Sequence, residues 1–128
     1  MPLILKGILD PADAEQAVEI AANGLVASNH GARNLDTLPA TIDALPAVAE
    51  SAGSHAAIIL DGGIRRGTDA LKSLPLGATA VMIGRTYVLA LATAGAAGVA
   101  LLSVCSETSS RLPWPSPGGA SSARSTAP

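Results

Sequence analysis

The first part of the chain repeats one pattern of hydrophobic and polar positions four times. Each repeat has a short continuous apolar run, a loop containing Gly, Asp or Asn, and a segment with apolar residues at helical spacing. Continuous apolar runs are typical of parallel strands covered on both faces, so each repeat predicts a strand followed by a helix. The predicted strands are Leu3–Leu5, Leu25–Ala27, Ala57–Leu60 and Ala80–Ile83, and the predicted helices are Pro11–Ala22, Ala40–Ala52, Gly67–Leu76 and Tyr87–Val104.

Four such units predict an α/β protein with parallel strands. At the first helix, Asp10 is a suitable N-cap and Pro11 a suitable first helical residue. A closed (β/α)8 barrel needs eight strands, so the chain is long enough for half a barrel. An isolated half would expose two strand edges and one face of its sheet. We therefore expect a homo-oligomer or a requirement for an N-terminal half.

Composition and charge exclude several classes of protein. The 128 residues allow one small domain, and an apolar content of 48% with only 2% aromatic residues suits a core of Ala, Val, Ile and Leu. Cys105 is the single cysteine, which excludes an intrachain disulfide. A net charge of -2 argues against a nucleic-acid partner. Residues 1–7 lack the pattern of a signal peptide, so a cytoplasmic location is expected.

Two C-terminal stretches differ from the repeats. In residues 106–128, Ser, Pro, Gly and Thr make up 15 of 23 residues, which predicts a disordered tail after a domain at residues 1–105. The twenty residues Thr86–Cys105 carry no charge and are long enough to span a bilayer. Their high content of Ala, Gly and Thr, and their place in a strand–helix unit, favour a helix that covers the sheet. Membrane association is therefore not expected.

Polar residues follow the predicted strands, where parallel α/β proteins place their sites. Lys6 can hold an anionic group or form a Schiff base, or it can be an ordinary surface lysine. His30 and Arg33 lie three positions apart after the second strand and suit proton abstraction beside a bound carboxylate. The alternative is a loop histidine and a solvated arginine. His55 is given no role.

Glycine-rich loops follow the last two strands. Adjacent Gly62 and Gly63 let backbone N–H groups approach a ligand, and Arg65 adds positive charge, as a phosphate site requires. Gly84 and Arg85 repeat this arrangement. Each loop alone can be an ordinary turn. Two neighbouring loops favour phosphate, because TIM barrels often bind it after strands 7 and 8.

The sequence resembles the FMN-dependent α-hydroxy-acid oxidases and dehydrogenases, which include glycolate oxidase and flavin L-lactate dehydrogenase. The resemblance covers about residues 3–102 and rests mainly on S-N-H-G-A-R-N-L-D at 28–36 and D-G-G-I-R-R-G-T-D at 61–69. It implies the TIM-barrel family, with about four C-terminal units present, so that the chain is a fragment. The four earlier units, with a carboxylate partner for the base histidine, are not found, and Asn34 replaces the usual Gln.

The resemblance also implies FMN as cofactor and a reaction that oxidises an (S)-2-hydroxy acid to a 2-oxo acid. His30 would be the base, acting on the hydroxyl proton or on the α-proton, and Arg33 would bind the substrate carboxylate. Lys6 would lie near N1 and O2 of the flavin, and Ser28 near its ribityl chain. The remaining ribityl and phosphate contacts would come from Asp61, Gly62, Gly63, Ile64, Arg65, Gly84 and Arg85. The alternative is an inactive half barrel that binds a phosphate-bearing ligand or self-associates.

Overall fold

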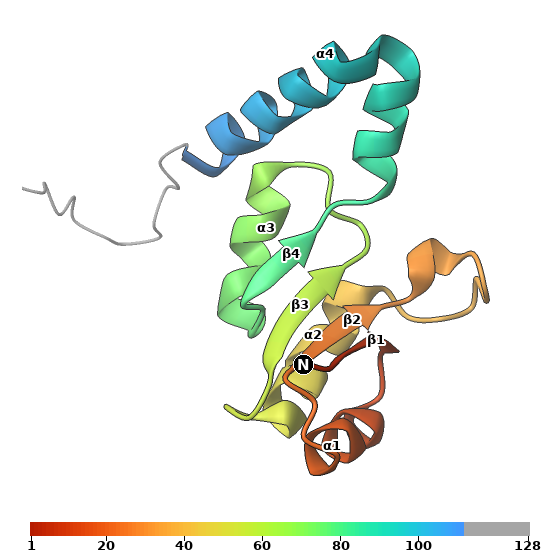
Figure 1. Cartoon of the computed structure of the whole chain (residues 1–128), viewed down its shortest axis with the longest axis vertical. Coiled ribbons are helices and arrows are strands. Elements are labelled where there is room, and N and C mark those ends of the chain that lie inside the picture. Colours follow the sequence, from red (N-terminus) through yellow and green to blue (C-terminus); the bar gives the residue numbers. More distant parts are fainter. Residues whose placement is uncertain (112–128) are drawn as a thin grey trace, which may run out of the picture.

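The structure, a computed structural model, describes the backbone of residues 1–111 and the side chains of residues 1–107. It contains the four predicted strand–helix units in the predicted order (Figure 1). The strands are β1 (Ile4–Ile8), β2 (Gly24–Ser28), β3 (Ala57–Asp61) and β4 (Ala80–Met82). The helices are α1 (Pro11–Glu19), α2 (Thr41–Ala52), α3 (Gly67–Ser73) and α4 (Arg85–Arg111), with short 3-10 turns η1 (His30–Ala32) and η2 (Leu74–Leu76).

The strands form one sheet in the order β1-β2-β3-β4, and every neighbouring pair is parallel. Ser28 pairs with Asp61, and Lys6 pairs with Val26 two positions earlier along β2. Because the strands are parallel, all of them end at the same edge of the sheet. Lys6, Ser28 and Asp61 lie within strands. The loops that carry the other predicted site residues leave the sheet side by side.

The hydrophobic core lies on one face of this sheet. Leu25 of β2 and Leu60 of β3 are fully buried there, in a cluster with Leu45 and Val48 of α2 and Ala14 of α1. The side chains are aliphatic, as the composition predicts. Their burial fixes which side of each strand faces the helices, because successive side chains alternate between faces.

The opposite face of the sheet is open. Ile4 is 53% exposed and Met82 is 42% exposed, although both lie in strands. Only β2 is buried along its whole length, so the expectation of strands covered on both faces is wrong for the other three. Within the described residues, β1 and β4 each have one unpaired edge. The open face and free edges expected of a half barrel are confirmed.

The start of α1 follows the predicted capping pattern. The Asp10 carboxylate accepts a hydrogen bond of 2.8 Å from the backbone N–H of Ala12, and Pro11 is the first helical residue. This contact satisfies an N–H group that has no partner inside the helix. The helix ends at Glu19, three residues before the predicted end.

The last helix differs from the prediction. Ala94 and Gly95 leave the helical conformation, with φ of −142° and +56°, so that α4 is kinked. Figure 1 shows α4 beyond the carboxyl ends of the strands, and its main packing partner is α3. The stretch Arg85–Glu107 is long and apolar enough to cross a membrane. Its most apolar 18 residues have a mean hydropathy of 2.2 and are 0% buried. The prediction that this helix covers the sheet is therefore wrong.

The predicted boundary at Ser106 also shifts. The helix α4 continues to Arg111, so the first six residues assigned to a disordered tail are helical. The rest of that predicted tail, residues 112–128, lies outside the described residues.

Candidate active site

Three predicted site residues meet at the carboxyl edge of the sheet. The Lys6 ammonium donates a hydrogen bond of 2.9 Å to the Ser28 hydroxyl and forms an ion pair with the Asp61 carboxylate. The Ser28 hydroxyl donates a hydrogen bond of 2.7 Å to the same carboxylate. Strand register explains the cluster, because Ser28 lies directly beside Asp61 and Lys6 comes from the other neighbour of β2.

This cluster keeps Asp61 ionised. Burial raises the pKa of the Asp61 carboxyl, but hydrogen bonds from Lys6 and Ser28 and the charges of Lys6 and His30 outweigh that effect. The net result is a pKa below the ordinary value of 3.8. The carboxylate is therefore a hydrogen-bond acceptor at neutral pH. Its negative charge holds the Lys6 ammonium in place at the edge of the open face.

The loop after β2 holds His30 in a constrained backbone. His30 and Ala32 have φ of +56° and +58°, in the left-handed region that side-chain-bearing residues seldom occupy. The N–H of His30 donates to the Ser28 hydroxyl at 3.1 Å, and the N–H of Gly31 donates to the Asn29 side chain at 3.0 Å. These contacts compensate for the backbone strain and direct His30 toward the Lys6 cluster.

The imidazole of His30 lies against Gly7. A Cβ atom added at Gly7 would lie 2.7 Å from Cε1 of His30, and Gly7 itself has φ of +101°. Only glycine satisfies both requirements at this position. Arg33 lies five residues past the end of β2. It is exposed and makes no hydrogen bond or ion pair within the described part of the chain.

The loop after β3 has the geometry of an anion site. Gly62 and Gly63 have φ of +120° and +78°, so their peptides turn away from the strand direction. A Cβ atom at Gly62 would lie 2.9 Å from the Thr41 hydroxyl, whereas one at Gly63 would meet nothing within 4 Å. One side of this loop is thus packed against α2 and the other is free for a ligand.

Asp69 holds the far end of the same loop. Its carboxylate accepts hydrogen bonds from the backbone N–H groups of Arg65 and Arg66, at 3.0 and 2.9 Å. Burial raises the pKa of Asp69, but these bonds and the charges of Lys72 and Arg66 outweigh that effect, so the net pKa lies below 3.8. The backbone N–H of Arg65 is therefore already bonded to Asp69, whereas the Arg65 side chain is exposed.

Arg85 reaches from the end of β4 to the loop after β2. Its Nη2 donates a hydrogen bond of 2.8 Å to the carbonyl of Gly31. The two residues line a cavity of about 240 Å³ together with Gly62 and Gly63. Ile64 is buried, and its carbonyl accepts a hydrogen bond from Thr86, which ties the two glycine-rich loops together; Gly84 is exposed beside them.

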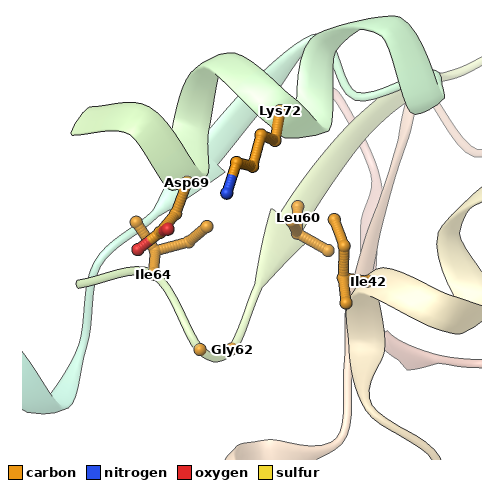
Figure 2. Close-up of a pocket in the computed structure, with 7 residues that line it drawn as sticks. Ile42, Leu60, Gly62, Ile64, Asp69 and Lys72 are labelled. Carbon is orange, nitrogen blue, oxygen red and sulfur yellow. The ribbon is translucent and has the colours of Figure 1, made fainter. Parts of the chain in front are cut away.

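A second cavity, of about 230 Å³, lies on the helix side of the same glycines. Figure 2 shows Lys72 extending from α3 toward the space between Ile64 and Leu60, with Ile42 on the far wall. Its lining is mostly aliphatic, and its charged residues, Asp69 and Lys72, interact with each other.

The structure gathers most of the predicted site residues into two adjoining groups. Lys6, Ser28, Asp61 and His30 form one group, while the glycine-rich loops and Arg85 form an adjoining group. Arg33 and Arg65 lie at the same edge of the sheet. Neither side chain makes a hydrogen bond or ion pair within residues 1–107.

Sequence reasoning missed three supporting residues: Asn29, Thr41 and Asp69. Asn29 begins an Asx turn, and Asp69 lies in the first turn of a helix, which are signals that can be found in a sequence. Thr41 gives no such signal, because its role depends on a contact across the fold.

Comparison with known proteins identifies the chain's relatives. The sequence model of the FMN-dependent dehydrogenases matches residues 1–107. The chain belongs to this family. It is 52% identical over 101 residues to an L-lactate dehydrogenase of Chromohalobacter salexigens and 50% identical over 99 residues to a 2-hydroxyacid oxidase of Dictyostelium discoideum.

Solved structures place the fold in the same family. Mandelate oxidase bound to benzoyl-formic acid superposes with a TM-score of 0.81 at 44% identity, over 87% of this chain and 33% of that one. Mandelate oxidase with (S)-2-phenylpropionate superposes with a TM-score of 0.79. The four units thus correspond to part of a TIM barrel. The chain spans about a quarter of the length of the curated relatives, since its matches cover 26% of each.

The chain's own residues fit the phosphate end of FMN. A phosphate needs backbone N–H groups that can approach it and a cation beside it. The open side of Gly63 and the guanidinium of Arg85 line one cavity and supply both. At about 240 Å³ the cavity is smaller than a typical whole-ligand pocket of roughly 300–1,000 Å³. Its size suits one end of the cofactor.

Proposed function

We propose that this chain provides the base, the carboxylate-binding arginine and the phosphate site of an FMN-dependent enzyme that oxidises an (S)-2-hydroxy acid to a 2-oxo acid. The observation that carries the proposal is the group formed by Lys6, Ser28, Asp61 and His30 beside the Gly62–Gly63 cavity. A proton acceptor and an anion site lie on one edge of the sheet. The relatives' names as L-lactate dehydrogenase and 2-hydroxyacid oxidase support the substrate class.

The roles of His30 and Arg33 follow from their chemistry. Oxidation of a 2-hydroxy acid removes two protons, one from the hydroxyl group and one from C2, together with two electrons. His30 takes one proton from the substrate, from the hydroxyl group or from C2, because neutral imidazole is a base near pH 7. Arg33, with no partner in the described residues, holds the carboxylate through paired N–H groups. FMN, when bound, supplies the two-electron acceptor.

Lys6 and Asp61 have complementary roles in this proposal. With FMN bound, the Lys6 ammonium would stabilise negative charge on the flavin ring near N1 and O2. Asp61 and Ser28 hold the ammonium in place. With FMN bound, the Asp61 carboxylate would accept hydrogen bonds from ribityl hydroxyls, and the Ser28 hydroxyl would donate or accept them. Gly62, Gly63, Ile64, Arg65, Gly84 and Arg85 hold the phosphate end through backbone N–H groups and two guanidinium charges.

An absorbance titration tests the cofactor and the base separately. The purified chain is mixed with FMN, freed of excess, scanned, and scanned again with L-lactate or glycolate without oxygen. The proposal expects a bound-flavin spectrum that bleaches with the hydroxy acid. His30→Asn removes the base but introduces a residue that tolerates the left-handed backbone at this position. This variant should bind FMN, and its flavin spectrum should not bleach with the hydroxy acid. His55→Asn is the matched control on an exposed histidine. Failure of the chain to take up FMN would contradict the proposal.

A second candidate is self-association of an inactive half barrel. The open face carries exposed Ile4 and Met82, and β1 and β4 have free edges in the described structure. A two-fold axis parallel to the strands would set β4 of each copy beside β1 of the other, closing eight parallel strands. Light scattering during gel filtration tests this: a dimer that binds no FMN supports it. A chain that stays monomeric would contradict self-association and point instead to a separate N-terminal half.

A further inference from the structure

One hydrogen bond joins the two ends of the candidate site. Arg85 follows β4, and Gly31 lies in the loop after β2, yet Nη2 of Arg85 donates to the Gly31 carbonyl at 2.8 Å. Both strands neighbour β3, so their ends are about 10 Å apart at the usual strand spacing. The arginine side chain therefore crosses the end of β3, over the loop that contains Gly62 and Gly63.

The Gly31 end of this bond lies in the strained loop. Residues 30–32 all have positive φ, and their backbone N–H groups donate hydrogen bonds to the adjacent Ser28 and Asn29. Among the described residues, Arg85 provides the one hydrogen bond to residues 30–32 from a distant part of the chain. The guanidinium thus helps to hold the segment that carries His30 and precedes Arg33.

The Arg85 end lies at the candidate anion site. Gly31, Gly62, Gly63 and Arg85 line the same cavity of about 240 Å³. A guanidinium has five N–H donors, and the Gly31 carbonyl takes one of them. The other donors can bind an anion in the cavity while the Gly31 bond stays in place. A lysine has no rigid fork and cannot make both contacts in fixed directions.

We propose that Arg85 is a positioning residue that couples the phosphate site to the base loop. An anion bound over Gly62 and Gly63 fixes the guanidinium, and the fixed guanidinium orders residues 30–33. This inference rests on the proposed function, because it uses the same anion site. It adds that an anion in the phosphate site positions His30 and Arg33 for substrate. Because coupling is reciprocal, ordering of the loop also increases the affinity for the anion.

Amide hydrogen exchange of the whole chain, with inorganic phosphate as the probe, tests the coupling. Phosphate binding is measured in parallel by equilibrium dialysis. Saturating phosphate should slow exchange of the amides of residues 30–33 by about fivefold or more, which is the lower end of the usual range of coupling between two sites. Arg85→Lys should still bind phosphate but lose this protection. Arg85→Ala should speed exchange in the same segment even without phosphate. Arg66→Lys, a matched change on a neighbouring exposed arginine, should behave as the unmodified chain.

The outcomes separate this inference from the proposed function. Phosphate that binds without slowing exchange, or that speeds it, would overturn the coupling and leave the phosphate site intact. Unchanged exchange in Arg85→Ala would also overturn the coupling. A chain that binds no phosphate would contradict the phosphate site and the coupling together.

Discussion

Lys6 and Asp61 are 55 positions apart in the sequence, and their side chains form an ion pair at the carboxyl edge of the sheet. Ser28, on the strand between them, bonds to both. The pair belongs to the first and third strands, so it forms only when β1, β2 and β3 take their correct register. The cluster therefore reports on assembly of the sheet as well as on the site.

Removing the carboxylate should destabilise the sheet edge. Asp61→Asn loses the ion pair and leaves Ser28 and Lys6 without a charged acceptor. We expect the free energy of unfolding to fall by about 1–2 kcal/mol, somewhat less than the roughly 1.5–3 kcal/mol usual for a hydrogen bond to a charged group. Lys6 is 38% exposed, so solvent screening keeps the effect at this level. Urea denaturation measures it, with Asp36→Asn on the exposed loop as control. An equal loss in both variants would contradict the role of the cluster.

Acid should destabilise the chain through two carboxylates. Asp61 and Asp69 both have pKa values lowered below 3.8 by folding. The unfolded chain therefore binds more protons between the folded and unfolded pKa values, so stability falls as pH falls. We expect a plateau above about pH 5 and a decline below about pH 4. Melting curves from pH 7 to pH 3 measure it. The combined substitution of both residues by Asn should flatten the decline, and an unaltered decline would contradict this assignment.

A side chain at Gly7 should displace the His30 ring. Gly7→Ala places Cβ 2.7 Å from Cε1 of His30 and also strains the backbone at φ +101°. Gly63→Ala has comparable backbone strain at φ +78° with open space around its Cβ, so it isolates the steric effect. Each should cost about 1–3 kcal/mol of stability from strain. Only Gly7→Ala should shift the imidazole resonances of His30 in NMR spectra. Identical imidazole shifts in both variants would argue against the contact.

Loss of Asp69 should loosen the loop after β3. Asp69→Ala removes the acceptor for two backbone N–H groups, those of Arg65 and Arg66. We expect a loss of about 1–2 kcal/mol, as for other helix-end caps, together with faster exchange of those two amides. Hydrogen exchange read residue by residue measures both effects. Asp43→Ala, also in the first turn of a helix, is the control. Protected amides at residues 65 and 66 in Asp69→Ala would contradict this account.

The sequence alone determined the elements of this protein and the edge where its site lies. Apolar runs set the four strands, and Asp10 with Pro11 set the start of α1, because these signals are local. The placement of Lys6, His30, Asp61 and Arg85 at one edge also followed, because parallel strands all end on the same side. The family followed from two strings of residues.

Only the tertiary structure decided which of these residues touch. The Lys6–Asp61 pair, the bond from Arg85 to Gly31 and the packing of Thr41 against Gly62 join residues from separate units. They depend on strand register and on side-chain direction, which a linear pattern does not contain. The kink at Gly95 and the exposed path of α4 likewise appear only in the tertiary structure. An apolar helix is stabilised by burying its apolar surface against another element. In the described structure α4 leaves the open face of the sheet uncovered and packs mainly on α3.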